Sequence, residues 1–239
     1  MNKFIRAAAV SATLASVAGA QAAPSAPPRI LTSGEAQVRV TPDRATILVG
    51  VQTRATTAAA AGASNARTQK AILDTLKAMG LAADQLATQS YSVNPEMQYP
   101  PSGGPGRVIG YTVSNVVRVE LRRIEQVGPV VDAALAKGAN QINSIQFSSS
   151  TASEARRTAM ADAVRDARAD AEALAKAAGG SLGQVIEISS SAPPIRPVYA
   201  EVMMRSAAKA DVSTPIEPGE QVISASVSVI WQFVPGAVR

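Results

Sequence analysis

Three aspartates could together hold a cation. Asp162, Asp166 and Asp170 are spaced four residues apart in a segment whose pattern predicts a helix, so their carboxylates share one helical face. Oxygen ligands of this kind suit Ca²⁺ or Mg²⁺. Arg165 lies among them, however, and the segment has no loop whose backbone oxygens could complete a coordination shell. The pattern therefore favours a solvated helix face that carries charges of both signs, and we expect no bound metal there.

A single carboxylate, Asp43, follows Pro42 after a predicted strand, where it could act as a catalytic group. Aspartate and proline are also the commonest turn formers, and no second carboxylate is close in the sequence. We therefore interpret Asp43 as a turn residue.

The absence of two residue types excludes much of the chemistry of enzymes. The sequence contains no His, so an imidazole base, a Ser-His-Asp triad and a His-ligated zinc are excluded. It also contains no Cys, which excludes disulfides, thiolate nucleophiles and sulfur-ligated metals. Catalysis by carboxylates alone remains an alternative, but we expect a protein that is not an enzyme and that binds no cofactor.

Two further motifs have a structural interpretation as well as a functional one. The run Gly103-Gly104-Pro105-Gly106 resembles a phosphate-binding loop, but such a loop needs Gly-Lys-Ser/Thr at the start of a helix, and here a strand is predicted to follow. Four aromatic residues could stack on sugars or bases, although scattered aromatics are more often core and rim residues. These four are Tyr99, Tyr111, Tyr199 and Trp231.

The proline-rich stretch at 191–218 holds the candidate interaction residues Tyr199, Met203, Met204 and Arg205. Methionine pairs make adaptable contacts and can be oxidised to sulfoxides. A loop of this length inside a compact domain is either functional or an ordinary insertion. We refer to 191–218 as the Pro-rich arm.

The N-terminus has the features of a secretory signal. Lys3 and Arg6 precede an apolar stretch of about a dozen residues, which is shorter than the roughly twenty residues of a spanning helix. Ala20-Gln21-Ala22 supplies small residues where a signal peptidase cuts, so we predict cleavage after Ala22 and a periplasmic location. Loss of the two basic residues lowers the formal net charge from +5 to +3, which gives little reason to expect nucleic-acid binding.

The mature chain alternates between strand and helix patterns. Residues 23–32 are interpreted as a flexible leader, and 33–239 as one domain that includes the Pro-rich arm. Alternating apolar residues on both sides of Thr41-Pro42-Asp43 indicate either a hairpin or a strand broken at a bend. Thr56 and Thr57 can cap an alanine-rich helix that ends at Gly80. The other elements that we predict are a hairpin of 87–98 with 108–121, a helix at 125–137, and strands at 142–148, 182–188 and 223–233.

The longest predicted helix follows a capping-box sequence, Thr151-Ala-Ser-Glu154, and runs to about Ala178. Its apolar stripe is predicted to contain Met160, Val164, Ala167, Ala171, Leu174 and Ala178. Hairpins imply antiparallel pairing, and alternating polar faces imply helices on one side only. The fold class is therefore α+β: an antiparallel sheet of long hairpins packed on one face by about three helices, one of them long.

An ordered series of motifs resembles the SIMPL-domain family, which includes the bacterial periplasmic immunogenic, or outer-membrane antigen, proteins. The series covers nearly all of the mature chain. A departure is Ala36, where family members often carry a second glycine, so we expect a less tight bend there. The motifs are Ser33-Gly34-Glu35-Ala36, Gly110-Tyr111-Thr112-Val113-Ser114-Asn115, Val131-Asp132-Ala133-Ala134, Ala159-Met160-Ala161-Asp162-Ala163-Val164 and Pro215-Ile216-Glu217-Pro218-Gly219-Glu220.

The resemblance implies a periplasmic or outer-membrane-associated α+β protein that assembles into large homo-oligomeric rings or channel-like barrels. It also implies a role in tolerance of envelope or oxidative stress, and it brings no catalytic residue. Our first hypothesis is a non-enzymatic protein that self-assembles through its long strands and the Pro-rich arm. The alternative is a periplasmic module that binds a peptide, a lipid or an envelope polymer.

Overall fold

A computed structural model describes residues 27–191, 196–198 and 216–236. The α+β class and the antiparallel pairing are confirmed. The elements in chain order are β1 (Arg29–Val40), β2 (Arg44–Ala55), α1 (Ala58–Ala78), η1 (Ala83–Gln85), β3 (Leu86–Gln98), β4 (Arg107–Leu121), η2 (Ile124–Gln126), α2 (Val127–Ala136), β5 (Gln141–Ser148), α3 (Ala152–Ala177), β6 (Gly180–Ser191), β7 (Arg196–Val198) and β8 (Glu220–Pro235).

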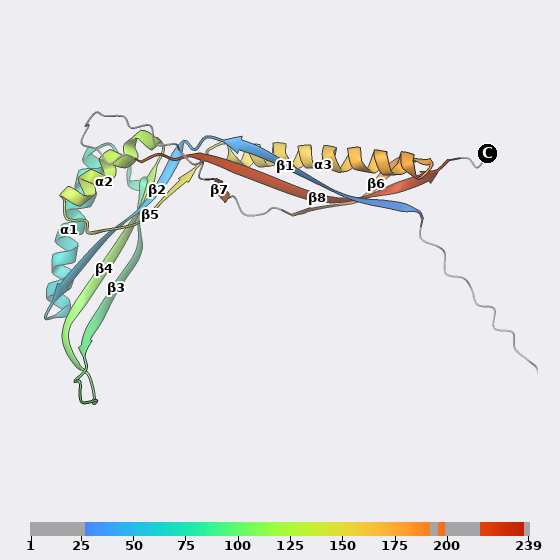
Figure 1. The fold of residues 1–239 in the computed structure, drawn as a ribbon. Coiled ribbons are helices and arrows are strands. Elements are labelled where there is room, and N and C mark those ends of the chain that lie inside the picture. The colour runs from blue at the N-terminus through green and yellow to red at the C-terminus, as the bar shows by residue number, and fades with distance from the viewer. Residues whose placement is uncertain (1–26, 192–195, 199–215, 237–239) are drawn as a thin grey trace, which may run out of the picture.

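The strands form two sheets and not the single sheet that we expected (Figure 1). One sheet has the order β3-β4-β2-β5 and is covered by α1 and α2; we call this part, residues 41–150, the hairpin lobe. The other has the order β1-β8-β6, with β7 also paired to β8, and is covered by α3; we call its described residues, 27–40, 151–191, 196–198 and 216–236, the α3 lobe. The two lobes meet at a bend, with the helices on its outer side.

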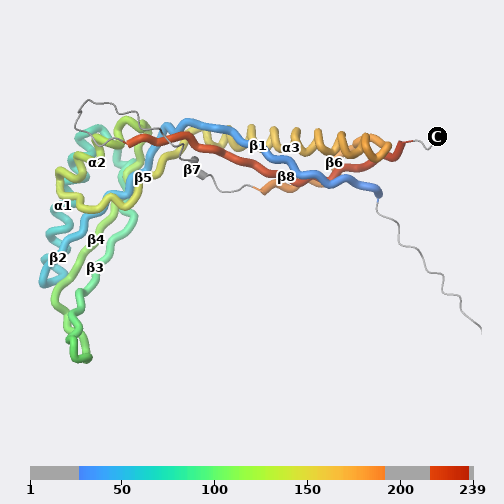
Figure 2. The backbone as a smooth tube through the Cα atoms, in the orientation of Figure 1, coloured from blue at the N-terminus to red at the C-terminus, as the bar shows by residue number. Residues whose placement is uncertain are grey.

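The bend explains why two sheets form. Of the two alternatives at Thr41–Asp43, the strand broken at a bend is correct, because β1 pairs with β8 whereas β2 pairs with β4 and β5. Figure 2 shows the chain passing directly from one lobe into the other at this point. A hydrogen bond from the Gln221 side chain to the carbonyl of Phe147 (2.6 Å) joins β8 to β5 across the bend.

The hairpin lobe has a core of β-branched and leucine side chains. Its central strand contributes Ile47, Val49 and Val51, which pack under Ile72 and Leu76 of α1. Thr57 caps α1 by accepting a hydrogen bond from Ala60 N (3.2 Å). The helix ends as predicted: Gly80 has a φ of 91°, and Leu81 N donates to the carbonyl of Leu76 (3.2 Å).

Polar amides lie inside this apolar core. Asn65 and Gln69, one turn apart on α1, are buried, and Asn65 Nδ2 donates to the carbonyls of Val51 (2.8 Å) and Val113 (3.4 Å). Within the described chain, Asn65 Oδ1 and both polar atoms of the Gln69 amide have no protein partner. An unpartnered buried polar atom costs about 1–3 kcal/mol, so these amides weaken the core locally.

The α3 lobe has a much thinner core. The buried face of α3 consists of alanines alone, namely Ala155, Ala159, Ala163, Ala167, Ala171 and Ala175. The predicted stripe is therefore correct only in part: Ala167 and Ala171 are buried, but Leu174 and Ala178 are exposed, and Met160 and Val164 lie at the side of the buried face. The small side chains allow the helix to lie directly on the sheet, where Trp231 fills the remaining space.

A glycine marks the closest approach of α3 to β1. A Cβ added to Gly34 would lie 2.0 Å from the carbonyl oxygen of Ala163 and 2.5 Å from the backbone N of Ala167. Both atoms belong to the helix backbone, which cannot move away as a side chain could. Ala36, two residues on, continues the regular pairing with β8, so the expected bend at this position is absent.

Two other expectations need correction. β1 begins at Arg29, so residues 29–32 belong to a strand and not to the flexible leader expected at 23–32. The capping box at Thr151–Glu154 does not form, because the Thr151 hydroxyl lies 3.0 Å from the Ser149 hydroxyl and makes no cap bond. The predicted signal sequence lies outside the described residues. Among the helices that the structure describes, none is long and apolar enough to cross a membrane.

We expect Gly34→Ala to destabilise the protein by about 3 kcal/mol, the upper end of the usual cost of overpacking, because the new methyl group meets helix backbone. Urea unfolding followed by circular dichroism measures this. Gly62→Ala in α1 is the matched control: only the Tyr91 hydroxyl lies near the new methyl group, at 3.5 Å, and the change should stabilise the helix by about 0.5–1 kcal/mol. Equal effects at the two glycines would contradict the close-contact interpretation.

The buried amides give a second pair of variants. Asn65→Leu should cost about 1–3 kcal/mol, because it leaves the carbonyls of Val51 and Val113 without this donor. Gln69→Leu replaces an amide that has two unpartnered polar atoms with an apolar side chain of similar volume. This change should be neutral or stabilising. The same unfolding assay tests both, and a cost at Gln69 as large as that at Asn65 would show that the Gln69 amide has partners in solution.

Candidate functional site

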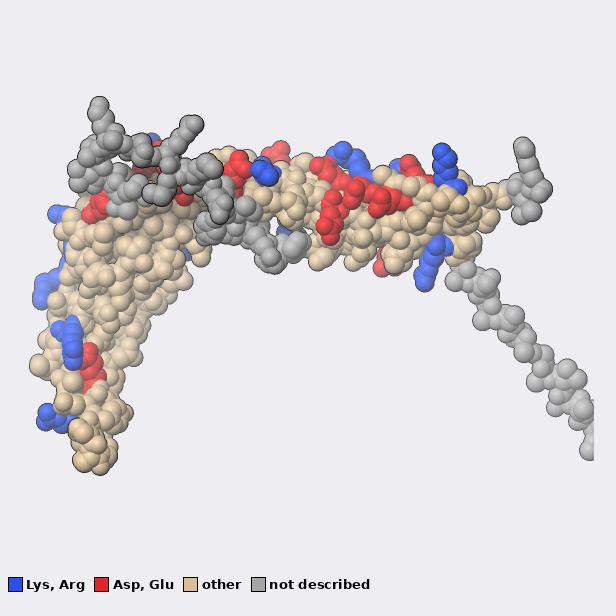
Figure 3. Space-filling view, in the orientation of Figure 1, with Lys and Arg blue, Asp and Glu red and all other residues tan. Residues whose placement is uncertain are grey.

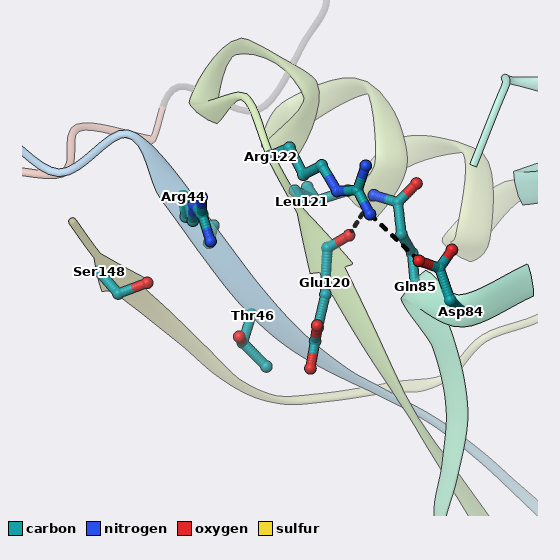
Figure 4. Close-up of a pocket in the computed structure, with 9 residues that line it drawn as sticks. Arg44, Thr46, Asp84, Gln85, Glu120, Leu121, Arg122 and Ser148 are labelled. Carbon is teal, nitrogen blue, oxygen red and sulfur yellow. Dashed lines mark hydrogen bonds and ion pairs between the residues drawn. The ribbon is translucent and has the colours of Figure 1, made fainter. Parts of the chain in front are cut away.

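A polar pocket of about 340 Å³ lies at the end of the hairpin lobe next to the bend (Figure 4). Strand register brings its walls together, since Ala45 pairs with Leu121 on one side of β2 and Arg44 pairs with Ser148 on the other. η1 closes it. The lining residues are Arg44, Ala45, Thr46, Asp84, Gln85, Glu120, Leu121, Arg122 and Ser148.

Three charged groups of this pocket, Asp84, Arg122 and Glu120, are paired with one another or with a neighbour. Arg122 Nη2 lies 3.1 Å from Asp84 Oδ2, and Arg118 lies 3.2 Å from the Glu120 carboxylate. Gln85 donates through Nε2 to the carbonyl of Glu120 (2.7 Å) and accepts from Ala82 N (3.0 Å). Figure 4 shows the Arg122 side chain, which directly follows β4, beside Asp84, and the Gln85 side chain of η1 beside the Glu120 carbonyl. These bonds join β4 to η1 around the pocket, and the polar groups of its walls can form hydrogen bonds.

A second pocket, of about 470 Å³, lies along the bend itself and shares Arg122 with the first. Asp43 is in its wall. The Asp43 carboxylate accepts hydrogen bonds from the Ser150 hydroxyl and from Ser150 N (2.7 Å). These bonds, the side-chain one first, lower the pKa of the Asp43 carboxyl below its ordinary value.

The hydrogen bonds of Asp43 fit its interpretation as a turn residue. Asp43 N also donates to the carbonyl of Ser148 (3.1 Å). The residue therefore ties the turn after β1 to the segment between β5 and α3, which is a structural role at the bend.

Two of the three aspartates in the row on α3 make contacts within the protein. Asp162 forms an ion pair with Arg165, as the charge-laced interpretation predicts. Asp166 accepts a hydrogen bond from Glu35 N (3.1 Å), which ties the helix to β1. Among the described residues, no group of three or more acidic side chains could hold a metal ion.

The aromatic residues do not form one platform. Tyr99 is 69% exposed in the loop between β3 and β4, whereas Tyr111 is half-buried within β4. Trp231 is buried in the other lobe, where its Nε1 donates to the Thr32 hydroxyl (2.9 Å), which in turn donates to the carbonyl of Ala167 (2.8 Å). The fourth aromatic, Tyr199, lies outside the described residues, as do the other candidate interaction residues Met203, Met204 and Arg205.

Sequence reasoning missed a group of exposed apolar side chains at the end of the hairpin. β2 pairs with β4 only as far as Ala55 opposite Tyr111, so the last part of the hairpin is a two-stranded ribbon without a third strand. We call these exposed side chains the hairpin tip. They are Met97, Tyr99, Val108 and Ile109. The signal in the sequence was that the hairpin strands are longer than the helix that could cover them.

We expect Asp43→Asn to destabilise the protein at neutral pH and to matter less in acid. Because the folded-state pKa is lowered, the carboxylate contributes stability above the unfolded-state pKa of about 4, and this contribution is lost as the pH falls through the folded-state value. Urea midpoints of parent and variant at pH 7 and pH 3 measure it. Asp74→Asn is the control, because Asp74 forms an exposed i,i+4 ion pair with Lys70 on α1. An equal pH dependence of the stability loss in both variants would contradict the structural role of Asp43.

Comparison with known proteins shows the family of this chain. The SIMPL family, described as protein of unknown function (DUF541), matches residues 30–231. The chain is 32% identical over 217 residues to the 26 kDa periplasmic immunogenic protein of Brucella melitensis, with 87% of this chain and 85% of the relative covered. It is 27% identical to the uncharacterized protein YggE of Edwardsiella ictaluri, covering 81% of each chain, and 26% identical to YggE of Escherichia coli K12, covering 87% and 84%. The chain belongs to the SIMPL family.

Proposed function

We propose that this chain is a periplasmic, non-enzymatic protein whose copies self-assemble into a large homo-oligomer. The name of the Brucella relatives supports the periplasmic location. The cleavage after Ala22, the association with the outer membrane and the role in envelope or oxidative stress stay predictions from the sequence.

The observation that carries the proposal is the exposed hairpin tip. Monomeric proteins rarely expose contiguous apolar patches beyond a few hundred Å², and larger ones mark interaction sites. A two-stranded ribbon is only marginally stable alone in water. Here the ribbon bears Met97 and Val108, which are paired in the register, and Ile109 on its other face, with Tyr99 in the adjoining loop, all of them exposed. A partner that covers the ribbon would remove apolar surface from water and support its two strands.

The two pockets at the bend support a non-enzymatic function, because several of their polar groups hold the structure together. Their ionisable groups form ion pairs and turn-anchoring hydrogen bonds, as described for Arg122, Asp84 and Asp43. Exposed pairs of this kind contribute little energy but hold geometry. The sequence supplies neither imidazole nor thiol to these sites.

A specific observation favours the alternative, a binding module. The loop at the end of the hairpin forms a pocket of about 300 Å³, lined by Tyr99, Pro100, Pro101 and Pro105, with Gln98 and Arg107 at its side. Its walls are mostly apolar rings with two polar groups, a composition typical of a small ligand site. Size in solution separates the two functions, because a binding module is expected to be a monomer or dimer.

We expect the chain without residues 1–22 to elute as a particle of many subunits, whose mass by light scattering does not change with concentration. A double variant of the hairpin tip, Tyr99→Ser with Ile109→Ser, should reduce that mass to one or a few subunits with unchanged circular dichroism.

Leu135→Ser is the matched control, since Leu135 is an equally exposed apolar residue on α2 in the same lobe. It should leave the particle mass unchanged. A parent protein that is monomeric at all concentrations would refute self-assembly and leave the binding module.

A further inference from the structure

The first of the two pockets at the bend combines charges of both signs on one face of the hairpin-lobe sheet. We call it the corner pocket. Ala45 and Leu121 belong to the core beneath the helices, so the residues that alternate with them along β2 and β4 point to the opposite face of the sheet, which no helix covers. The residues of this face that line the pocket are Arg44, Thr46, Glu120 and Ser148.

Strand register fixes the spacing of the two signs. Thr46 pairs with Glu120, and Arg44 stands two residues before Thr46 on the same strand. The arginine and the glutamate are therefore diagonal neighbours across β2 and β4, a relation that corresponds to about 7–8 Å. Figure 4 shows the Thr46 and Glu120 side chains leaving their strands on the same side. A positive and a negative group thus border one small volume of about 340 Å³.

The protein itself uses these two groups only in part. Arg44 forms no ion pair with a residue that the structure describes. Its neighbour Asp43 attracts it electrostatically, but that carboxylate makes its hydrogen bonds to Ser150. Among the described residues, the Glu120 carboxylate has one ion pair, from Oε1 to Arg118 at 3.2 Å, and both side chains are nearly half exposed. The Arg44 guanidinium and one oxygen of Glu120 are available to a ligand.

The balance of charge decides what kind of ligand fits. Arg122 and Asp84, the other two charged groups of the corner pocket, neutralise each other at 3.1 Å. A simple anion would be attracted by Arg44 but repelled by Glu120, and a simple cation would meet the reverse. The pocket differs in this respect from the surface of the α3 lobe, where Figure 3 shows acidic side chains gathered together. A ligand that carries both charges satisfies both groups.

We propose that the corner pocket binds a small zwitterion, of which a dipeptide with free termini is the simplest that spans it. The carboxylate of the ligand binds the Arg44 guanidinium, whose planar fork of donors matches a carboxylate, and the Ser148 hydroxyl can donate to it as well. The ammonium group of the ligand binds the Glu120 carboxylate. Thr46 lies between the two charged residues and offers its hydroxyl to the peptide unit.

The dimensions agree with a ligand of this size. A volume of about 340 Å³ is at the lower end of the range for small-molecule pockets. In an α-amino acid both charged groups are attached to one carbon, whereas a peptide unit separates those of a dipeptide, which suits the diagonal spacing of Arg44 and Glu120. The corner pocket lies next to the bend and the hairpin tip at the far end of β3 and β4, so this site does not depend on the proposed self-assembly.

Glycylglycine and two analogues test the charges one at a time. The chain without residues 1–22 is titrated by isothermal calorimetry with glycylglycine, with its N-acetyl derivative, which keeps only the carboxylate, and with its amide, which keeps only the ammonium group. We expect glycylglycine to bind at least about tenfold more tightly than either analogue, because each analogue loses one charge-assisted contact.

Two variants assign each charge to a residue. Arg44→Gln should weaken the binding of glycylglycine and abolish its advantage over the amide, whereas Glu120→Gln should abolish its advantage over the N-acetyl derivative. Both side chains are exposed, so the variants should fold, and circular dichroism checks this. Arg67→Gln is the matched control, since Arg67 is an exposed arginine on α1 that forms no ion pair with a described residue, and it should bind like the parent.

Three results would overturn the inference. Equal affinity for glycylglycine and either analogue would show that one charge is sufficient. Binding that persists in both Arg44→Gln and Glu120→Gln would place the ligand outside the corner pocket. The third is the absence of measurable binding of glycylglycine at millimolar concentrations. None of these results bears on self-assembly, which the particle mass tests separately.

Discussion

The direct contact between the backbones of α3 and β1 at Gly34 is the constraint on which the α3 lobe depends. Helix and strand can touch there only because the helix presents alanines and the strand presents no Cβ. This contact brings Thr32 within 2.8 Å of the Ala167 carbonyl and Glu35 N within 3.1 Å of Asp166, so polar bonds hold both sides of the crossing. Trp231, which donates to Thr32, then fills the volume that small residues leave. The lobe is consequently thin, with one helix on one sheet.

A two-layer construction leaves surfaces that the chain itself does not cover. α3 covers one face of its sheet, and α1 with α2 cover one face of the other. The opposite face of the β1–β8 pair is polar, because Ser33 pairs with Ser228 and Gln37 with Ser224, so water can cover it. The hairpin tip is different, since apolar side chains there stay exposed beyond the third strand of the sheet. Exposed apolar surface of this kind is what the partner that we propose would cover.

Local signals in the sequence predicted the local structure well. The Thr57 cap, the Gly80 ending of α1 and the alternation of β8 needed no knowledge of distant residues, and all three are present. The alanine stripe was predicted only at Ala167 and Ala171, because a hydrophobicity pattern ranks Met160 and Leu174 above alanine, whereas a close helix–strand contact selects for small size. The corner pocket was not predictable, because its walls come from β2, β4, β5 and η1 and meet only through strand register. For the same reason, the Asp43 turn was foreseen but its partner Ser150 was not.

The bend connects these observations to function. In the proposed homo-oligomer, the angle between the two lobes would set how successive copies are oriented. Among the described residues, the Gln221 side chain of the α3 lobe donates to the Phe147 carbonyl of the hairpin lobe, and Ile216 packs on the core of the hairpin lobe. Within the hairpin lobe, Asp43 and Ser150 tie together the two segments that lead into the α3 lobe. The polar group that first suggested chemistry, Asp43, therefore has a structural role at the bend.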